Sequence, residues 1–233
     1  MTTASPSGAA FVFPREYYFP PFFTRQTNLT THHAQLTKWS ALVLSYCRHY
    51  RIFKLSLSST SPSSTTTTTT SSSSLIPSNP SSTLTGTTST TSLVSTATTL
   101  TANTATSTTN TEELFHNRKL NRRLNLSDIR EVIDFLVKDG RAEYVGDSKS
   151  GDIVWVYWRT PEEWAALIES WVDETAQRGT VLTLYELTQG ENTRGTEFYG
   201  LDPELLQKAL QILVKRSKAQ IFGQEDSLGV KFF

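Results

Sequence analysis

Apolar side chains recur at helical spacing near the N-terminal end of the chain. One face of a predicted helix carries residues at i, i+3, i+7, i+10 and i+14, namely Leu36, Trp39, Val43, Tyr46 and Tyr50. Residues 52–57 follow as a short run of β-prone side chains. The pattern therefore predicts a long amphipathic helix that leads into a strand.

A second helical stripe lies beyond a long polar segment. Ser127 is placed to cap a helix, and Gly140 is placed to end it. The inward face of this helix is predicted to carry Ile129, Val132, Ile133, Leu136 and Val137. Residues 113–119 predict a short helix ahead of it. Two strands at 142–145 and 153–158 predict a hairpin whose loop spans 146–151.

The same order of elements recurs from Thr160 to the last residue. Thr160, Pro161 and Glu163 form a capping box with proline at the first helical position, and Glu162 and Glu163 are first-turn capping acids. The helix that follows carries an apolar stripe at Trp164, Leu167, Ile168, Trp171 and Val172. A strand at 181–183 leads into a second capping box, Thr183 with Glu186.

A third helix of this second copy is predicted to start at Asp202, Pro203 and Glu204. Its inward residues are Leu206, Ala209, Leu210 and Leu213. Strands at 220–222 and 230–233 close the chain. Helix, strand, helix, helix and hairpin is the order of a winged helix, so the fold class predicted is α+β with two tandem winged-helix domains. The domains expected are a disordered leader 1–12, a first unit 13–159 and a second unit 160–233.

The first unit is interrupted by residues 56–111, which are almost entirely Ser and Thr. No charged residue lies between Lys54 and Glu112. Such a segment buries too little apolar surface to offset its ordering entropy, so we expect a disordered insertion. A lineage-specific loop and untranslated sequence carried into the chain are both compatible with this composition.

Charge is unevenly distributed along a chain that is neutral overall. Residues 1–111 carry +5, residues 112–159 are neutral, and residues 160–233 carry −5. A winged helix commonly binds DNA through its third helix, so a DNA-binding or transcription-associated protein is the alternative function. The acidic second unit argues against it. A single basic cluster, formed by Arg118, Lys119, Arg122 and Arg123, could face nucleic acid, anionic lipid or a protein partner.

Catalytic and metal-binding motifs are not evident in the sequence. His32 and His33 are adjacent and so point apart on a helix, which predicts a surface role, and Cys47 is expected to be a buried apolar residue. The acids between Glu186 and Glu197 are interpreted as a solvated face. We expect no enzyme, no cofactor and no metal. With no signal peptide and no apolar run long enough to span a bilayer, the expected location is the cytosol.

The segment 13–23 is unusually rich in aromatic residues and proline. It includes a run that we call the hook, Pro20, Pro21, Phe22 and Phe23. Proline fixes its own φ and favours extended neighbours, which lowers the ordering cost of binding, so we predict an extended segment that offers aromatic anchors to a partner. The alternative is that these aromatic side chains cover the first domain of their own chain.

Several motifs together resemble a known family. Residues 19–24 (FPPFFT), 159–164 (RTPEEW), 183–187 (TLYEL) and 229–233 (GVKFF) resemble the small tandem winged-helix subunit of the ESCRT-II complex, and Leu114-Phe115 matches in position. The resemblance covers nearly all the chain outside the first dozen residues and the insertion. One departure is that the proline motif ends in Phe23 rather than Tyr, which removes a hydroxyl and weakens the motif as a WW-domain ligand.

The resemblance implies a structural and adaptor role. Two copies of such a subunit join two larger winged-helix subunits, and the N-terminal domain docks through a motif that maps to Pro20, Pro21, Phe22 and Phe23. The C-terminal domain recruits the initiating subunit of ESCRT-III, in a pathway that sorts ubiquitinated cargo into multivesicular bodies. The implied protein is cytoplasmic, is recruited peripherally to endosomal membrane through its partners and binds no nucleic acid.

Overall fold

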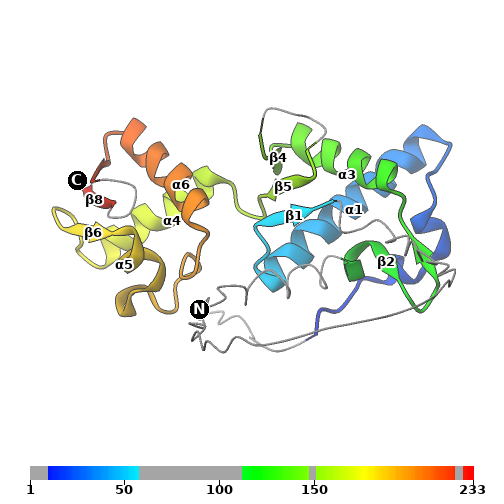
Figure 1. Cartoon of the computed structure of the whole chain (residues 1–233), viewed down its shortest axis with the longest axis horizontal. Helices are drawn as coiled ribbons and strands as arrows, with labels where there is room; N and C mark the ends of the chain where they lie inside the picture. Colours follow the sequence, from blue (N-terminus) through cyan, green and yellow to red (C-terminus); the bar gives the residue numbers. More distant parts are fainter. Residues whose placement is uncertain (1–9, 58–111, 147–150, 224–227) are drawn as a thin grey trace, which may run out of the picture.

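The computed structural model describes residues 10–57, 112–146, 151–223 and 228–233. They form two lobes joined end to end by the short link between β5 and α4 (Figure 1). The insertion expected to be disordered, 56–111, lies outside the described residues except for its first two, where the prediction is wrong because Ser56 belongs to β1 and Leu57 is buried. Residues 147–150 of the hairpin loop expected at 146–151 also lie outside them.

The first lobe begins with two 3-10 turns, η1 (Arg15–Tyr18) and η2 (Pro20–Phe23), and the long helix α1 (Leu29–Tyr50). Strand β1 (Lys54–Ser56), a helical turn at 112–115 and the small hairpin β2 (His116–Asn117) and β3 (Arg122–Arg123) follow. Helix α3 (Leu126–Lys138) and strands β4 (Ala142–Tyr144) and β5 (Ile153–Val156) complete the lobe.

The second lobe repeats this order. It contains α4 (Pro161–Glu174), β6 (Val181–Thr183), α5 (Leu184–Gln189), the 3-10 turn η4 (Glu191–Thr193), α6 (Pro203–Lys215), β7 (Ala219–Phe222) and β8 (Gly229–Phe232). The sheets have equivalent antiparallel orders, β1-β5-β4 and β6-β8-β7, in which the strand after the first helix pairs with the last strand of the hairpin. The α+β tandem winged-helix prediction is therefore confirmed.

Local signals account for where several helices begin and end. Thr160 and Thr183 both form the predicted capping boxes with Glu163 and Glu186. Helix α3 ends at Lys138, and Gly140 follows with φ of +69°, a left-handed conformation that suits glycine. These helix ends can be predicted from the local sequence, without knowledge of tertiary contacts.

Three local predictions are wrong. Helix α3 begins at Leu126 after the N-cap residue Asn125, so Ser127 lies inside the helix and does not cap it. Val137, at the edge of the apolar stripe, is exposed and does not join the core. The helix expected at 113–119 is only the turn 112–115, because residues 116–117 pair with 122–123 as strands.

Strand β5 belongs to both hydrophobic cores. Successive strand residues point to opposite faces, so Val154 and Val156 enter the first core while Trp155 and Tyr157 enter the second. The second core therefore extends across the junction between residues 159 and 160. At the other end of the chain, Phe11 packs edge-on against Tyr46 with ring centroids 5.0 Å apart, so this residue of the expected leader contacts the first lobe.

Candidate functional site: the hook and its support

The hook is a single 3-10 turn. Phe19 before it is extended, as expected for a residue that precedes proline, with φ of −104° and ψ of 111°. The Phe22 amide donates to the Phe19 carbonyl at 2.9 Å, and the Thr24 amide donates to the Pro21 carbonyl at 3.1 Å. The prediction of a fully extended segment is wrong, because these two backbone hydrogen bonds tighten residues 20–23 into a turn.

The side chains of the hook divide into an outer and an inner pair. Phe22 and Phe23 are 6% and 3% exposed, whereas Pro20 and Pro21 face solvent and the neighbouring Phe19 is 60% exposed. Phe22 lies flat on the Trp39 ring of α1 with centroids 4.4 Å apart, and Phe23 meets the same ring edge-on at 5.4 Å. Two of the four predicted anchors therefore cover the chain's own core.

Helix α1 also holds the backbone of the hook. The Trp39 indole Nε1 donates to the Phe22 carbonyl at 3.0 Å, and the Gln35 amide donates to the carbonyls of Phe22 at 2.8 Å and Thr24 at 2.9 Å. Because Gln35 and Trp39 are buried, these hydrogen bonds are shielded from competing water. The outward-facing prolines thus rest on a turn fixed by both ring stacking and hydrogen bonds.

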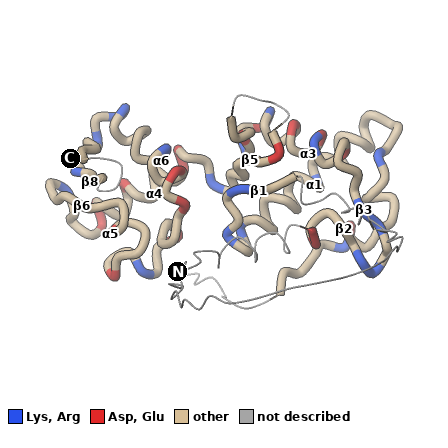
Figure 2. Tube along the Cα trace, viewed as in Figure 1, with Lys and Arg blue, Asp and Glu red and all other residues tan. Residues whose placement is uncertain are grey.

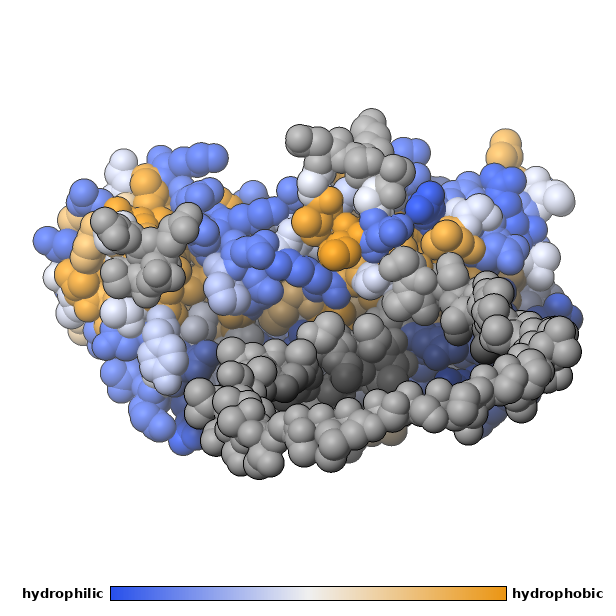
Figure 3. Space-filling model, in the orientation of Figure 1, coloured by the Kyte–Doolittle hydropathy of each residue, from blue (hydrophilic) through white to orange (hydrophobic). Residues whose placement is uncertain are grey.

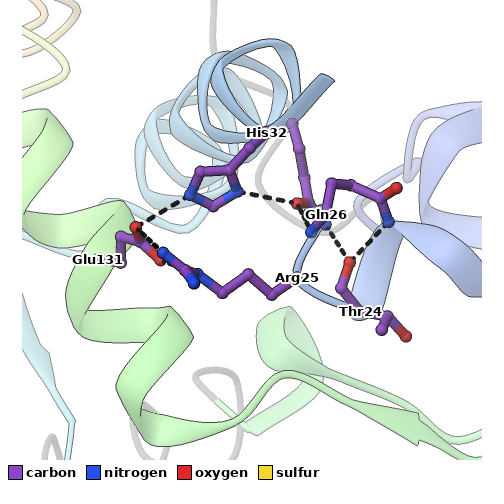
Figure 4. A network of polar contacts seen from close by, with 6 residues as sticks. Thr24, Arg25, Gln26, His32 and Glu131 are labelled. Atoms are coloured by element: carbon purple, nitrogen blue, oxygen red, sulfur yellow. Dashed lines mark hydrogen bonds and ion pairs between the residues drawn. The ribbon is translucent and has the colours of Figure 1, made fainter. Parts of the chain in front are cut away.

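A polar network ties this support to α3 (Figure 4). Arg25 donates two hydrogen bonds to the Glu131 carboxylate, at 3.0 and 3.1 Å, and His32 Nε2 contacts the same carboxylate at 2.9 Å. The hydrogen bond from Arg25 is the main cause that lowers the pKa of Glu131 from its usual 4.5 to about 2. His32 Nδ1 lies 3.4 Å from Gln35 Oε1, and this oxygen also accepts a hydrogen bond from the backbone N–H of Gln26.

This network corrects the surface role predicted for His32. Its side chain is only 12% exposed and lies between two helices, whereas the adjacent His33 is exposed. Sequence reasoning also missed Gln35, Arg25 and Glu131 as supports of the hook. A glutamine within an amphipathic helix and an ion pair between residues 106 positions apart leave no local pattern by which to find them.

A small apolar pocket lies beside the hook. It measures about 180 Å³ and is lined by Glu16, Phe19, Pro21, Phe22, Gln26, Thr31, Ala34, Gln35 and Lys38. Lys38 and Glu16 form an ion pair of 2.9 Å at this pocket. The N-terminal segment therefore offers exposed side chains, Phe19 and Pro21, at the rim of a pocket that could hold a side chain of a partner.

The β2–β3 hairpin lies against the same segment. The Asn117 amide donates to the Tyr17 carbonyl at 2.8 Å, and the Tyr17 hydroxyl donates to the Glu113 carbonyl. The predicted basic cluster lies on this hairpin and its turn, where Arg118 forms an ion pair with Glu112 at 3.4 Å. The cluster therefore lies next to the hook.

Helix α3, the helix that would enter DNA in the alternative function, has several of its charges engaged within the chain. Glu131 is held by Arg25, and Arg130 lies 3.5 Å from Asp152. The equivalent helix α6 starts with Asp202, whose carboxylate accepts from the Glu204 amide at 2.9 Å, so its N-terminus presents acidic groups. These contacts do not favour DNA binding.

The second lobe exposes apolar side chains around its sheet. Val181, Tyr185, Phe222 and Phe233 are each more than 40% exposed. Hydrophobic residues are visible at the left end of the space-filling view, over this lobe, and also over the first lobe (Figure 3). Val181 and Phe222 lie on the two outer strands of the β6-β8-β7 sheet, beside Lys231 and Gly229 of β8, and Tyr185 lies on α5.

Chemistry elsewhere in the described residues is sparse. No cluster of three or more potential metal ligands occurs among them. Cys47 is fully buried as predicted, and burial raises the pKa of its thiol to about 12, which disfavours a reactive thiolate. Within the part of the chain that the structure describes, no helix is long and apolar enough to cross a membrane.

Known proteins share this sequence and this fold. The family described as ESCRT-II complex subunit matches residues 16–202. Vacuolar protein-sorting-associated protein 25 of Homo sapiens is 36% identical over 224 residues, covering 96% of this chain and 98% of that protein. Its counterpart in Dictyostelium discoideum is 31% identical and covers 97% and 98% of the two chains.

Solved structures agree on the fold. A crystal structure of subunit VPS25 of ESCRT-II has a TM-score of 0.65 and 22% identity, covering 94% of this chain and 98% of that chain. A chain of a crystal structure of the ESCRT-II complex of VPS22, VPS25 and VPS36 gives a TM-score of 0.64. The family match spans most of the chain, and the relatives align over nearly their whole lengths. This chain belongs to the ESCRT-II complex subunit family, in vacuolar protein sorting.

Proposed function

We propose that this chain is a non-enzymatic assembly subunit that docks through its first domain onto two larger winged-helix subunits of ESCRT-II. The observation that carries the proposal is the divided hook, with exposed Phe19, Pro20 and Pro21 supported from behind by buried Phe22 and Phe23. Proline and aromatic side chains that are already ordered lose little entropy on binding. The similar structure that contains VPS22 and VPS36 alongside VPS25 supports partners of this kind.

The four hook residues have different roles in this proposal. Pro20 and Pro21 contact the partner, and Phe19 and the adjacent pocket widen the surface that they offer. Phe22 and Phe23 act from within, because their rings hold the turn against Trp39. Their replacement would therefore weaken docking by loosening the hook.

The second domain is proposed to recruit the initiating subunit of ESCRT-III. Its exposed apolar surface around Val181, Tyr185, Phe222 and Phe233 is of the kind that marks a protein-binding site. Two copies of the chain per complex would present two such surfaces. In this arrangement the protein is cytoplasmic and reaches the endosomal membrane through its partners, in sorting of ubiquitinated cargo into multivesicular bodies.

Light scattering after size-exclusion chromatography tests the docking. The chain is mixed with its two larger subunits, and wild type is compared with Pro20→Ala/Pro21→Ala and with the control Pro203→Ala, an exposed proline of the second domain. The proposal expects a complex with two copies of wild type and of the control. It expects loss of that complex for the hook variant, whose circular dichroism stays that of wild type.

Two outcomes would contradict the proposal. An unchanged complex with the hook variant would remove the prolines from the interface. A wild-type monomer that ignores both partners and instead shows salt-dependent DNA binding would favour the alternative function. Recruitment is tested separately by adding the ESCRT-III subunit to the assembled complex, and a complex that fails to bind it would refute that half alone.

A further inference from the structure

Charges of opposite sign face each other across the junction of the two lobes (Figure 2). The first domain contributes chiefly cations there, Arg48, Arg51, Lys54, Arg141 and Arg159. The second contributes chiefly anions, Glu163, Glu197, Asp202 and Glu204. The net negative charge of residues 160–233 is thus matched in part by its own neighbour domain.

Glu197 is the centre of one side of this junction. Its carboxylate accepts from Arg48 Nη2 at 2.9 Å and from the guanidinium of Arg159. Arg51 Nη2 donates to the backbone carbonyls of Glu197 at 3.1 Å and Tyr199 at 2.6 Å. Three cations from the first domain therefore converge on one loop of the second, and the interpretation of Glu197 as part of a solvated face is wrong.

A second set of contacts also crosses the junction. Lys54 lies 4.4 Å from the Trp155 ring centroid and 2.7 Å from the Glu204 carboxylate. Lys208 lies over the same ring at 5.4 Å and forms an ion pair with Glu143 at 2.7 Å. A third site pairs Arg141 with Glu163, at 3.0 and 3.2 Å.

Apolar contacts cross the junction as well, and we call them the seam. Trp155 of β5 and Tyr157 directly after it enter the second core, and Phe53 stacks on Trp158 with centroids 4.6 Å apart. Apolar attraction is non-directional, so these contacts hold the two domains together more strongly than they define the angle between them. Charged hydrogen bonds are directional, and complementary charges set the register of two surfaces.

We infer that these charge pairs form a latch that fixes the angle between the two winged helices, and that Glu197 is its principal residue. The seam supplies adhesion, and the charge pairs that accompany it restrain rotation of one domain against the other. Isolated surface pairs contribute little, but several cations converging on one carboxylate and its backbone carbonyls act as a network. The inference rests on contacts within this chain, so it stands or falls independently of the docking proposal.

The consequence is a rigid arm. The hook and the apolar surface around the β6-β8-β7 sheet lie in different lobes, so the latch sets the direction in which one points relative to the other. Without it, the apolar contacts alone would hold the two domains together, and their relative angle would be less tightly fixed.

Residual dipolar couplings of the free chain test the latch. Backbone N–H couplings from α1 and α3 report the first domain, and those from α4 and α6 report the second. For wild type, a single alignment tensor is expected to fit both sets. For Glu197→Gln, each domain should still fit its own structure, but the alignment of one domain should fall by about twofold relative to the other.

Two further variants make the result decisive. Glu191→Gln is the matched control, because this exposed residue of the same region pairs only with nearby Arg194 at 3.2 Å among the described contacts, and it should behave as wild type. Arg48→Gln removes one exposed ion pair of the latch and should give a smaller but measurable difference between the two alignment tensors. This variant keeps the test decisive if Glu197→Gln fails to fold. A single tensor for both domains in Arg48→Gln and Glu197→Gln, or two tensors in wild type, would overturn the inference.

Discussion

The two winged helices share one order of elements but complete their hydrophobic cores in different ways. The first core is closed by the N-terminal segment, where Tyr17, Phe22 and Phe23 cover Trp39 of α1. The second has no such segment before α4 and is closed by Trp155 and Tyr157 from the sheet of its neighbour. Neither winged helix therefore completes its hydrophobic core with its own repeated elements. The N-terminal segment that closes the first core also carries the proposed docking surface, and the residues that close the second core join the two domains.

This difference explains where each domain has surface left to offer. The inner side of the N-terminal segment is buried against the first core, and its outer side is exposed at Phe19, Pro20 and Pro21. The second domain is buried where it meets the first domain, and it exposes Val181 and Phe222 of its own sheet. Four predictions test this comparison, from the largest expected effect to the smallest.

Phe22→Ala should destabilise the first domain by about 4 kcal/mol, because it removes a fully packed ring from Trp39. Urea unfolding followed by circular dichroism gives the free energy. Phe19→Ala is the matched control, since its exposed ring leaves no cavity, and it should change stability by less than about 0.5 kcal/mol. Equal losses for both variants would show that the hook does not seal the core.

Trp155→Ala should weaken the second domain by about 3 kcal/mol although the residue lies in the first domain's sheet. Native-state hydrogen exchange of the α6 amides measures the effect. Ile153→Ala, in the same strand but exposed, is the control and should leave those amides protected. If only first-domain amides lost protection in Trp155→Ala, the claim of a shared strand would fail.

Glu131→Gln should cost about 1.5 kcal/mol at pH 7, a value reduced for the one-third exposure of the side chain. The pKa of Glu131 is lowered to about 2 by Arg25, so its contribution is present above 4.5 and is lost as pH falls toward 2. Unfolding of wild type and variant should therefore differ at pH 7 and converge near pH 2. A difference that grew on acidification would have the wrong sign.

Thr160→Ala should cost about 1 kcal/mol, because Thr160 accepts from the Glu163 amide at the start of α4. Ser127→Ala, at the site where a cap was predicted but not found, should be nearly neutral. Thermal unfolding compares the two. A larger loss for Ser127→Ala would restore that residue as the cap of α3.

Sequence reasoning succeeded where the signal is local. The stripes of α1 and α4, the capping boxes at Thr160 and Thr183 and the left-handed Gly140 depend on residues a few positions apart. The helix expected at 113–119 failed because the pairing of His116 with Arg123 overrides helical preference.

The sequence singled out the hook but not its conformation. The hook stands out by composition, yet which of its rings face inward depends on Trp39 and Gln35, and these contacts follow only from the fold. The latch at Glu197 is still harder to predict, because Arg48 lies 149 residues away and no local charge pattern indicates that the two residues pair.

Hydroxyl-radical footprinting of the chain, alone and bound to its larger subunits, tests the central claim that a sealed hook presents its outer face. In the free chain, Phe19, Pro20 and Pro21 should be oxidised and Phe22 and Phe23 protected. In the complex, the outer three should become protected while the inner two stay unchanged. Oxidation of Phe22 and Phe23 in the free chain, or of Phe19 and Pro21 undiminished in the complex, would contradict the account.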